Sequence, residues 1–528
     1  MNVKTKQKII LFSLILFSAY SAITLGQTWD EGHLITQGKI TINYLFSIGR
    51  IDEDIFRREY YSPIYYSIKY LFLQIFPNQY QIEVNHLVNL IFSFGVIFAI
   101  KNLCKELFND KIAKITFLVL FLFPAFHGHM AFNSKDTILA FCHVWIFYSF
   151  IKYLKIQSKH KSSKYIYNIG ILSAIGTGTN LFFLGTLIPL LLFFFYEVFI
   201  TKKICSRNFI KKKFFLDFFK SFIIFYFIIV IFWIDTHPNI FLLPFKLFYE
   251  WAFTDLWRGY PYILVNGEYF IYKDIPKSYL ITNFAYKSPE YFLISYIFFI
   301  IFFLRSNNFF LKKISIFNYK IILIISMILY PFIMLLFTPF SIYDGFRHVL
   351  WMIPYTCIIP ALAIYYIIEN IKLIHIRIFG IFNSILIIYF LFNFILLTPY
   401  QYTYLNIFNG EKQNYNQKFE NDYWGSSIKE LINKSKLEKK SKITFSSCGI
   451  SEEVAKLYLK KAGFLNFSFE SLDKSDFIIM TNRATNQNDN KYSSDNVTNC
   501  FSKFVGIDIS HVKRNGIVLS VIRKINKS

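Results

Sequence analysis

Long apolar runs without charged residues recur along the first three quarters of the chain. With their flanking residues, these runs are long enough to cross about 30 Å of hydrocarbon as helices. They lie at 9–25, 85–100, 115–126, 137–151, 221–234, 291–304, 321–337, 349–368 and 378–397. The pattern predicts a membrane protein with many spanning helices.

A further apolar stretch, 165–200, contains a single charged residue, Glu197. As one helix it would be roughly 54 Å long, which is too long for one crossing. The Gly-Thr-Gly-Thr-Asn segment at 176–180 favours a turn in its middle, so we expect two helices here and eleven spans in total. The first run, 9–25, also allows a cleaved signal peptide, and that alternative stays open.

Basic residues are concentrated in alternate connections between the expected spans. Segments 101–114, 152–164, 202–220, 305–320 and 372–377 are each rich in Lys or Arg, whereas most acids near the membrane lie in the other connections. By the positive-inside rule, the basic segments and the N-terminus face the cytoplasm. Eleven crossings then place the C-terminus outside. We expect an integral protein of a bacterial inner membrane with a periplasmic C-terminus.

The composition narrows the class of protein. Of the 528 residues, 54% are hydrophobic and only 17% are charged, whereas soluble proteins carry about 25% charged residues. This composition excludes a soluble enzyme, a disordered chain and a coiled coil. The net charge of +24 might suggest a nucleic-acid partner, but the basic cytoplasmic segments account for much of it. We therefore expect membrane lipids, and no nucleic acid, as partners.

The segments expected outside the cytoplasm are long. We predict a membrane domain over 1–398 with outer loops at 26–85 and 235–290, and a small soluble α/β domain over 399–528. In the latter, the pattern predicts strands at 442–447 and 476–481, a helix at 451–462 beginning at Ser451, and a hairpin of 506–510 with 516–523 around Asn515-Gly516. The fold class is an all-α polytopic membrane protein with a C-terminal α/β domain.

Two apolar stretches in the outer loops, 60–76 and 240–253, carry scattered charge. They are typical of helices that lie at the membrane surface. The alternative, that 63–76 crosses the membrane, would invert every later connection and break the charge pattern.

The first outer loop opens with Asp30 and Glu31, directly after the first expected span. A carboxylate at a low-dielectric membrane surface can act as a general base, because burial raises its pKa toward the working pH. The alternative is that the two acids cap a surface helix at its N-terminus. Both interpretations stay open from these residues alone.

A second cluster, 124–136, lies at the outer end of the third expected span and ends in Lys135 and Asp136. A Lys there departs from the charge pattern, and such residues usually face a cavity or a partner. His127 and His129 could suggest a metal. They point apart on a helix, however, and no Cys or third His is nearby, so we expect capping or hydrogen bonding and no metal.

A third cluster, Asp344, Arg347 and His348, lies at the outer end of the ninth expected span. A guanidinium at that position suits bidentate binding of a phosphate, with His348 as a second donor. The alternative is an Asp344–Arg347 pair that closes the loop. Because all three clusters lie on one side of the membrane, we expect them to converge on one site, in which cations bind a lipid phosphate and a carboxylate activates a nucleophile.

These motifs and their order resemble the glycosyltransferase C (GT-C) superfamily, in particular its protein O-mannosyltransferase and aminoarabinose transferase branch. The similar segments are Trp29-Asp30-Glu31, the Phe-Asn-Ser-Lys-Asp-Thr sequence at 132–137, the Asp-Gly-Phe-Arg-His sequence at 344–348, and 400–410 with 419–425. Together they reach from the first span to about Gly425. The His-Pro-Pro-x-x-Lys stretch of the mannosyltransferases has only a degraded counterpart at 61–63 with Lys69.

The resemblance implies transfer of a sugar from a polyprenyl-phosphate donor to a lipid, glycan or protein acceptor outside the cytoplasm, with no cofactor. In that reaction Asp30, with Glu31 as the fallback, takes the proton of the acceptor hydroxyl, and the sugar is displaced with inversion. Lys135, Arg347 and His348 stabilise the leaving phosphate, and Asp136 and Asp344 complete the site. A divalent cation has no support in the sequence. The alternatives are a flippase for lipid-linked glycans and a non-catalytic assembly protein of the envelope.

Two of the six cysteines, Cys448 and Cys500, fall in the expected outer domain. If this domain lies in an oxidising periplasm, they can form a disulfide. The alternative, two independent thiols, stays open because sequence does not supply the distance between them.

Overall fold

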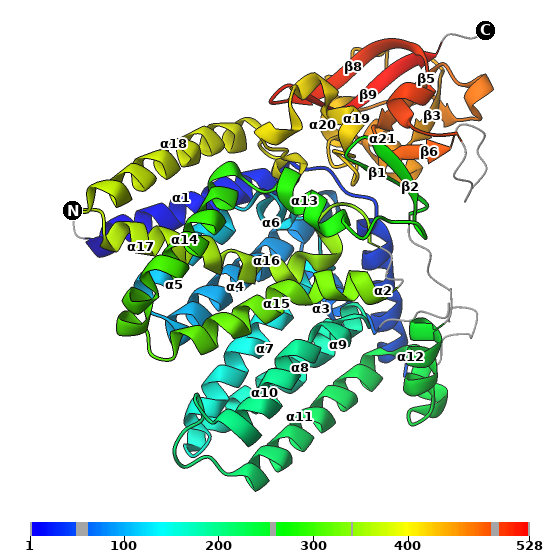
Figure 1. Ribbon diagram of the computed structural model, residues 1–528. Coiled ribbons are helices and arrows are strands. Elements are labelled where there is room, and N and C mark those ends of the chain that lie inside the picture. Colours follow the sequence, from blue (N-terminus) through cyan, green and yellow to red (C-terminus); the bar gives the residue numbers. More distant parts are fainter. Residues whose placement is uncertain (1–2, 49–61, 254–259, 339–341, 487–495, 526–528) are drawn as a thin grey trace.

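The structure, a computed structural model, describes residues 3–48, 62–253, 260–338, 342–486 and 496–525. A body of packed helices carries a small sheet domain at one end (Figure 1). The N-terminus lies at the end of the helical body that is far from the sheet domain (Figure 1).

Each of the eleven expected spans falls on a helix. These helices are α1 (Val3–Thr24), α4 (Gln81–Leu107), α5 (Asp110–Phe121), α7 (Asp136–Ile156), α8 (Ser163–Thr179), α10 (Ile188–Tyr196), α11 (Lys211–Phe232), α14 (Glu290–Lys313), α15 (Phe317–Phe337), α17 (Ile358–Glu369) and α18 (Ile374–Leu396). Within the described ranges, nine helical stretches are long and apolar enough to cross a membrane. With 12 and 17 residues, α5 and α8 are shorter than those stretches. The membrane class is thus confirmed, while the number of crossings stays a prediction.

The expected turn inside 165–200 is present. Helix α8 ends at Thr179, Asn180 has an extended backbone, and the chain continues as α9 (Phe183–Thr186) and α10. A side chain at Gly176 would collide with the ring of Phe183. Glycine therefore permits the close return of the chain that separates the two helices.

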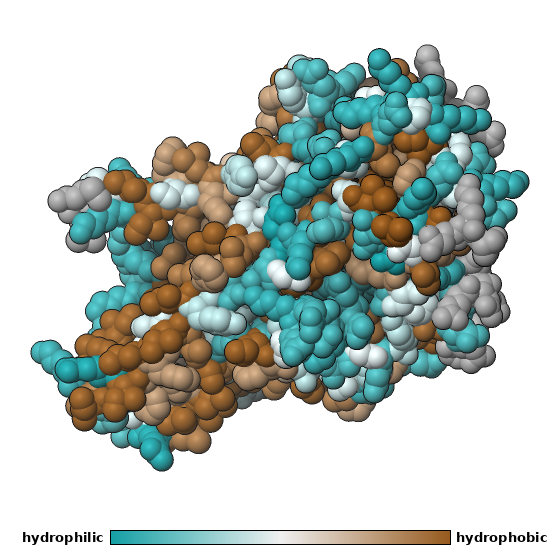
Figure 2. All heavy atoms as spheres, turned by 90° about the horizontal axis from the view of Figure 1, so that it is seen from above, coloured by the Kyte–Doolittle hydropathy of each residue, from teal (hydrophilic) through white to brown (hydrophobic). Residues whose placement is uncertain are grey.

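The lateral faces of the helical body are apolar. Phe219 and Phe227 of α11 and Ile388 of α18 each expose at least 60% of their surface. Figure 2 shows apolar side chains gathered over the helical part, with polar tips at its far end and a largely polar region toward the sheet domain. Large apolar faces of this kind are expected to contact lipid rather than water.

The basic segments of the sequence meet at the end of the body that lies opposite the sheet domain (Figure 1). Lys152 pairs with Glu106 at 2.8 Å, and Lys111 and Lys313 both pair with Glu369, at 2.5 and 3.8 Å. These contacts join connections that the sequence pattern assigns to one side of the membrane. The orientation of that side stays a prediction.

Two short helices lie where surface helices were expected. Helix α3 (Ile64–Leu73) has ten residues, about 15 Å, and is too short to cross a membrane. It packs on α2 (Glu31–Phe46) and α8, buries Lys69 and exposes Phe72. Helix α12 (Leu243–Phe253) buries little and exposes Phe245 and Phe253. The length of α3 favours a surface helix over the alternative in which 63–76 spans the membrane.

The sheet domain follows the predicted pattern closely. Its strands are β3 (Ile443–Cys448), β4 (Phe467–Phe469), β5 (Phe477–Thr481), β8 (Gly506–Arg514) and β9 (Ile517–Ile525), in the order β4-β3-β5-β9-β8. Strands β4, β3 and β5 are parallel, and β9 and β8 are antiparallel. Helix α21 (Glu452–Lys461) follows β3. Asn515 and Gly516 both have positive φ, as a tight hairpin turn requires.

Smaller elements connect the two parts of the molecule. Sequence analysis missed the hairpin of β1 (Tyr262–Val265) and β2 (Glu268–Ile271), although its Asn266-Gly267 turn is a hairpin signal. Strand β1 packs beside β6 (Ala484–Asn486), which pairs with β7 (Val497–Asn499). The remaining α-helices are α6 (Pro124–His129), α13 (Tyr279–Lys287), α16 (Ile353–Thr356), α19 (Tyr415–Lys418), α20 (Ile428–Lys434) and α22 (Cys500–Lys503). Two of the 3-10 turns, η6 (Arg347–Met352) and η7 (Gln401–Thr403), matter for the site.

The chain between the last membrane helix and the sheet domain packs on the helical body. Tyr404 donates a hydrogen bond to Glu290 at 2.6 Å, and the Asn406 side chain donates to two backbone carbonyls at the end of α13. A side chain at Gly128 of α6 would collide with the backbone of Tyr402 in η7. Residues 401–425 therefore form one wall of the helical body.

The predicted disulfide between Cys448 and Cys500 is confirmed. Their Cα atoms lie 5.8 Å apart, and the bridge closes a loop with a sequence separation of 52 residues. Cys448 ends β3 and Cys500 begins α22, so the bridge ties the parallel edge of the sheet to the segment that follows β7.

Replacing both Cys448 and Cys500 by Ser is expected to destabilise the sheet domain by about 4 kcal/mol, because the unfolded loop regains its chain entropy. Thermal denaturation of the purified protein, with limited proteolysis to follow the sheet domain, measures this loss. Cys205→Ser, at a partly buried free thiol, is the matched control. A double variant that melts like the wild type would contradict the expectation.

Candidate active site

Four of the residues singled out in the sequence meet around one guanidinium group. Arg347 contacts Asp30 through Nη2 at 2.6 Å, Asp136 through Nε at 3.2 Å and Asp344 through Nη1 at 3.2 Å. The three carboxylates come from segments that are separated by more than 100 residues in the sequence. The expected convergence of the three clusters is therefore seen in the geometry.

Each carboxylate lies at the start of an element. Asp30 precedes α2, Asp136 is the first residue of α7, and Asp344 lies in the turn before η6. That turn needs positive φ at Asp344 and Gly345, and Asp and Gly adopt this conformation more readily than other residues. The helix starts thus aim three carboxylates at the first residue of η6, Arg347.

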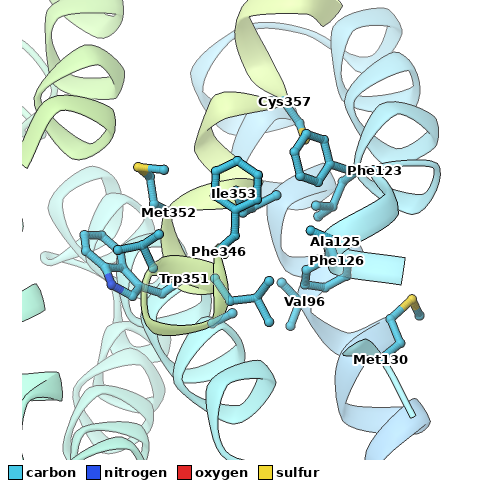
Figure 3. Close-up of a cluster of buried hydrophobic side chains, with 14 of the residues drawn as sticks. Val96, Phe123, Ala125, Phe126, Met130, Phe346, Trp351, Met352, Ile353 and Cys357 are labelled. Carbon is cyan, nitrogen blue, oxygen red and sulfur yellow. The ribbon is translucent and has the colours of Figure 1, made fainter. Parts of the chain in front are cut away.

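An apolar core holds η6 in place behind Arg347. Phe346 packs on Phe123, with ring centroids 5.9 Å apart, and Trp351, Met352 and Ile353 continue the same buried cluster (Figure 3). Because these side chains are fully enclosed, η6 has little freedom to shift relative to α6. The position of Arg347 is therefore set by packing as well as by its ion pairs.

The site opens to the surface at Asp30. The side chain of Asp30 is 34% exposed, whereas those of Arg347, Asp136 and Asp344 are at most 10% exposed. Asp30 makes no capping hydrogen bond to α2, which removes the capping alternative for this residue. Asp30 is thus a carboxylate that a dissolved or lipid-borne substrate can reach while a buried guanidinium holds it.

Glu31 does not join this cluster. Its carboxylate accepts hydrogen bonds from the backbone and hydroxyl of Thr28, at 2.7 and 2.9 Å, and from the Asn85 amide, and it pairs with His86 at 3.0 Å. Burial raises the pKa of Glu31, but the charge and hydrogen bond of His86, the Thr28 backbone and Lys69 outweigh it, so the pKa lies below its usual value. Glu31 therefore ties the start of α2 to α4.

We expect Glu31→Gln to lower the stability by about 1–3 kcal/mol, because its buried partners lose an ionised acceptor. Since Glu31 faces away from Arg347, turnover should stay near the wild-type value. Because the folded pKa is depressed, the stabilisation is present above pH 4.5, the unfolded value, and is lost as the pH falls below it. Melting curves from pH 7 to pH 3 and a turnover assay test this. A large loss of turnover in a folded variant would make Glu31 the base.

The two histidines of the second cluster make internal contacts. His127 packs its ring on Phe121, and its Nδ1 lies 3.1 Å from the Phe121 carbonyl. Asn133 Oδ1 accepts from the Asp136 backbone, so its amide nitrogen faces His129 Nδ1 at 3.0 Å. His129 Nε2 then carries the proton and donates it to the Tyr423 hydroxyl at 3.0 Å. Among the described residues, no group of three or more His, Cys, Asp or Glu side chains could hold a metal.

Lys135 and His348 border the cluster. Lys135 is partly buried and precedes Asp136, the residue that Arg347 contacts. The ring of His348 packs on Tyr343 with centroids 4.5 Å apart, and the charges of Arg347 and Lys135 both act on it. Both residues thus lie at the same corner of the site as Arg347.

Several residues of the site carried no individual signal in the sequence. Trp424 stacks on Arg347, with 4.1 Å between the guanidinium carbon and the ring centroid, and Arg483 pairs with Asp344 at 3.2 Å. Trp424 lies in the segment 419–425 that carried the family resemblance, whereas Arg483 lies in a region that no motif marked. Glu420 and Lys287 lie nearby, and burial raises the pKa of Glu420 to about 7 and lowers the pKa of Lys287 to about 8.

Lys69 lies behind Glu31 and is only 2% exposed. Among the described residues, no ion pair joins its ammonium group to a carboxylate, and this group lies 5.3 Å from the centroid of the Tyr65 ring. Burial lowers the pKa of Lys69 to about 8 in spite of the charge of Glu31. A buried ammonium group of this kind is a candidate binding group for an anion.

A small apolar pocket of about 10 Å³ lies beside η6. It is lined by Phe182, Leu280, Tyr330, Pro331, Met334, Leu335, Ile342, Val349 and Trp351. Two of these residues, Val349 and Trp351, belong to η6, whose first residue is Arg347. The pocket therefore lies beside the element that begins with Arg347, and its lining is apolar.

Comparisons with known proteins address the fold. No protein-family model matches the chain, and no curated protein matches it in sequence. Among solved structures, ArnT from Cupriavidus metallidurans in the apo state matches 99% of this chain and 98% of its own with a TM-score of 0.51 and 10% identity. ArnT, an aminoarabinose transferase, is a GT-C protein. The chain has the GT-C fold.

Two further structures with this fold score lower. ArnT bound to undecaprenyl phosphate gives a TM-score of 0.49 at 9% identity over 99% of this chain and 98% of its own. The oligosaccharyltransferase of Archaeoglobus fulgidus gives 0.43 at 11% identity over 89% of this chain and 69% of its own. The GT-C fold confirms the predicted fold class of a polytopic helical body with a C-terminal sheet domain.

Proposed function

We propose that this protein is a membrane glycosyltransferase that moves a sugar from a polyprenyl-phosphate donor to the hydroxyl group of an acceptor. The observation that carries the proposal is the pair of Asp30, which is reachable from the surface, and Arg347, which is buried behind it at 2.6 Å. A base and a phosphate ligand are the two groups that such a transfer requires. The GT-C fold, shared with a transferase whose structure contains undecaprenyl phosphate, supports the proposal.

In the proposed reaction Asp30 removes the proton of the acceptor hydroxyl. The acceptor oxygen then forms a bond to the anomeric carbon while the bond from that carbon to the phosphate oxygen breaks, so the configuration inverts. The leaving group is the polyprenyl monophosphate, whose additional negative charge Arg347, Lys135 and His348 stabilise. The buried ammonium group of Lys69 adds a further positive charge near the start of α2.

Donor binding would free the base. In the structure three N–H groups of Arg347 are used by Asp30, Asp136 and Asp344. A phosphate that approaches from the exposed side meets Nη2 first, because Asp30 is the most exposed of the three partners. Phosphate would replace Asp30 at Nη2, and Asp30 would then be available to accept a proton.

The hydrocarbon chain of the donor would lie along the apolar side chains beside η6. Val349 and Trp351 belong to this apolar surface and follow Arg347 in the chain by two and four residues. A lipid whose phosphate contacts Arg347 would therefore meet apolar side chains next to its phosphate. With the basic segments in the cytoplasm, the site would lie on the periplasmic face of a bacterial inner membrane.

The test of the proposal is transfer itself. The purified protein is reconstituted in liposomes with undecaprenyl-phosphate sugars that carry a radiolabel, together with an extract of acceptor lipids, glycans and proteins. Movement of label onto one acceptor, with release of undecaprenyl phosphate, is the expected result. Labelled lipid that crosses the bilayer with its sugar still attached would instead indicate a flippase. Labelled lipid that neither crosses the bilayer nor loses its sugar would favour a non-catalytic assembly protein.

A further inference from the structure

The sheet domain contributes a buried cation to the active site. Arg483 lies between β5 and β6 and is 4% exposed. Its Nη1 pairs with Asp344 Oδ1 at 3.2 Å and donates to the Tyr423 carbonyl at 2.6 Å. Its guanidinium carbon lies 3.7 Å from the ring centroid of Tyr260. Three contacts from three segments therefore hold this side chain in one position.

The backbone of Arg483 is fixed by the core of the sheet domain. Its carbonyl accepts a hydrogen bond from the backbone N–H of Cys500 at 2.9 Å, and Cys500 is bonded to Cys448. A side chain at Gly449 would lie 2.7 Å from the Cβ of Arg483, so the turn after β3 packs directly against it. Arg483 is thus a rigid extension of the disulfide-linked part of the domain.

Asp344 is shared between two guanidinium groups. Its Oδ2 faces Arg347 and its Oδ1 faces Arg483, both at 3.2 Å. Without Arg483, Asp344 would keep a single guanidinium contact among the described residues, the one with Arg347. The full charge of Asp344 would then attract Arg347, in competition with Asp30 and with an incoming phosphate.

We propose that Arg483 is a positioning residue for sugar transfer, which by neutralising and holding Asp344 keeps Arg347 in place for Asp30 and for the donor phosphate. This inference rests on the proposed transferase activity. In this role Arg483 makes the C-terminal sheet domain a part of the active site, rather than a separate binding module.

The experiment compares Arg483→Gln, Arg483→Lys, Asp344→Asn and the double variant Arg483→Gln/Asp344→Asn in the reconstituted transfer assay. Arg483→Gln is expected to lower kcat/KM roughly 10- to 100-fold, the range for one charged hydrogen bond. Arg483→Lys keeps the charge and should lose less. Asp344→Asn alone should also lose activity, because it leaves Arg483 unpaired.

The double variant gives the decisive readout. In the double variant, the negative charge of Asp344 is removed together with the positive charge of Arg483 that neutralised it. No excess negative charge then attracts Arg347, so the double variant should be more active than Arg483→Gln alone. Losses that simply add, or an Arg483→Gln protein that transfers sugar like the wild type, would overturn the positioning role. If Arg483→Gln does not fold, Arg483→Met, which keeps a long side chain without its charge, gives the same comparison with and without Asp344→Asn.

The controls separate this inference from the proposed function. Arg514→Gln removes a partly buried contact of the same domain, the 2.7 Å pair with Glu430, which lies outside the cluster, and should keep wild-type activity. Melting temperatures confirm that each variant is folded. A wild-type protein that transfers no sugar refutes the proposed function and this role together, whereas an active wild type with an unaffected Arg483→Gln variant refutes this role alone.

Discussion

Asp30→Asn is expected to lower kcat by roughly 10²–10⁴-fold, the contribution of a positioned general base. The amide keeps the shape of the side chain and can still accept a hydrogen bond from Arg347, which lies 2.6 Å away in the wild type. It cannot take a proton from the acceptor hydroxyl. Binding of the donor lipid should persist, because the phosphate contacts Arg347 and not the carboxylate.

Transfer kinetics and binding of undecaprenyl phosphate by native mass spectrometry test this expectation together. Asp508→Asn is the matched control, since Asp508 also pairs with an arginine at 2.6 Å but is exposed on the sheet domain. An Asp30→Asn protein with normal turnover would remove Asp30 from the reaction. Loss of donor binding with normal turnover of bound donor would make it a ligand rather than a base.

Arg347→Gln is expected to weaken donor binding by about 1.5–3 kcal/mol, roughly 10- to 150-fold in Kd, because the phosphate loses a charged hydrogen-bond donor. It should also lower the stability by about 3–5 kcal/mol, since Asp136 and Asp344 lose a buried counterion. Both carboxylates are at most 6% exposed and cannot recover that loss from water.

Titration of the donor lipid and thermal melting measure the two effects separately. Arg523→Gln breaks the pair with Asp508 on the sheet domain and should leave donor binding unchanged. Donor affinity at the wild-type level in a folded Arg347→Gln protein would contradict the assignment of Arg347 to the phosphate and would favour Lys135 or Lys69 as the ligand.

Apolar periodicity and charge carried most of the fold prediction. A run such as 321–337 has no stable alternative to a membrane helix, because its backbone must satisfy its hydrogen bonds internally in lipid. The turn at 176–180 and the hairpin at Asn515-Gly516 followed from local backbone preferences, which act within a few residues. The number of crossings did not follow from the sequence. Where a short helix such as α5, with 12 residues, begins and ends depends on the helices that pack against it.

The site was predicted only in part. Asp30, Asp136, Asp344 and Arg347 were expected at one surface, and the structure brings them into contact. Glu31 was named beside Asp30, yet one residue along a helix rotates a side chain by about 100°, which turns it toward His86. The sequence shows adjacency and cannot show this direction without knowing what packs on each face.

The sequence by itself determined the membrane class, the positions of the apolar helices, the sheet domain and the side on which the polar motifs gather. These properties depend on hydrophobicity and local conformation, which are properties of short segments. The tertiary structure alone decided that Arg347 is shared by three carboxylates, that Trp424 stacks on it and that Arg483 reaches Asp344 from the sheet domain. Except for the Asp344–Arg347 pair, those contacts join residues more than 70 positions apart, and only the packing of the complete chain sets their distances.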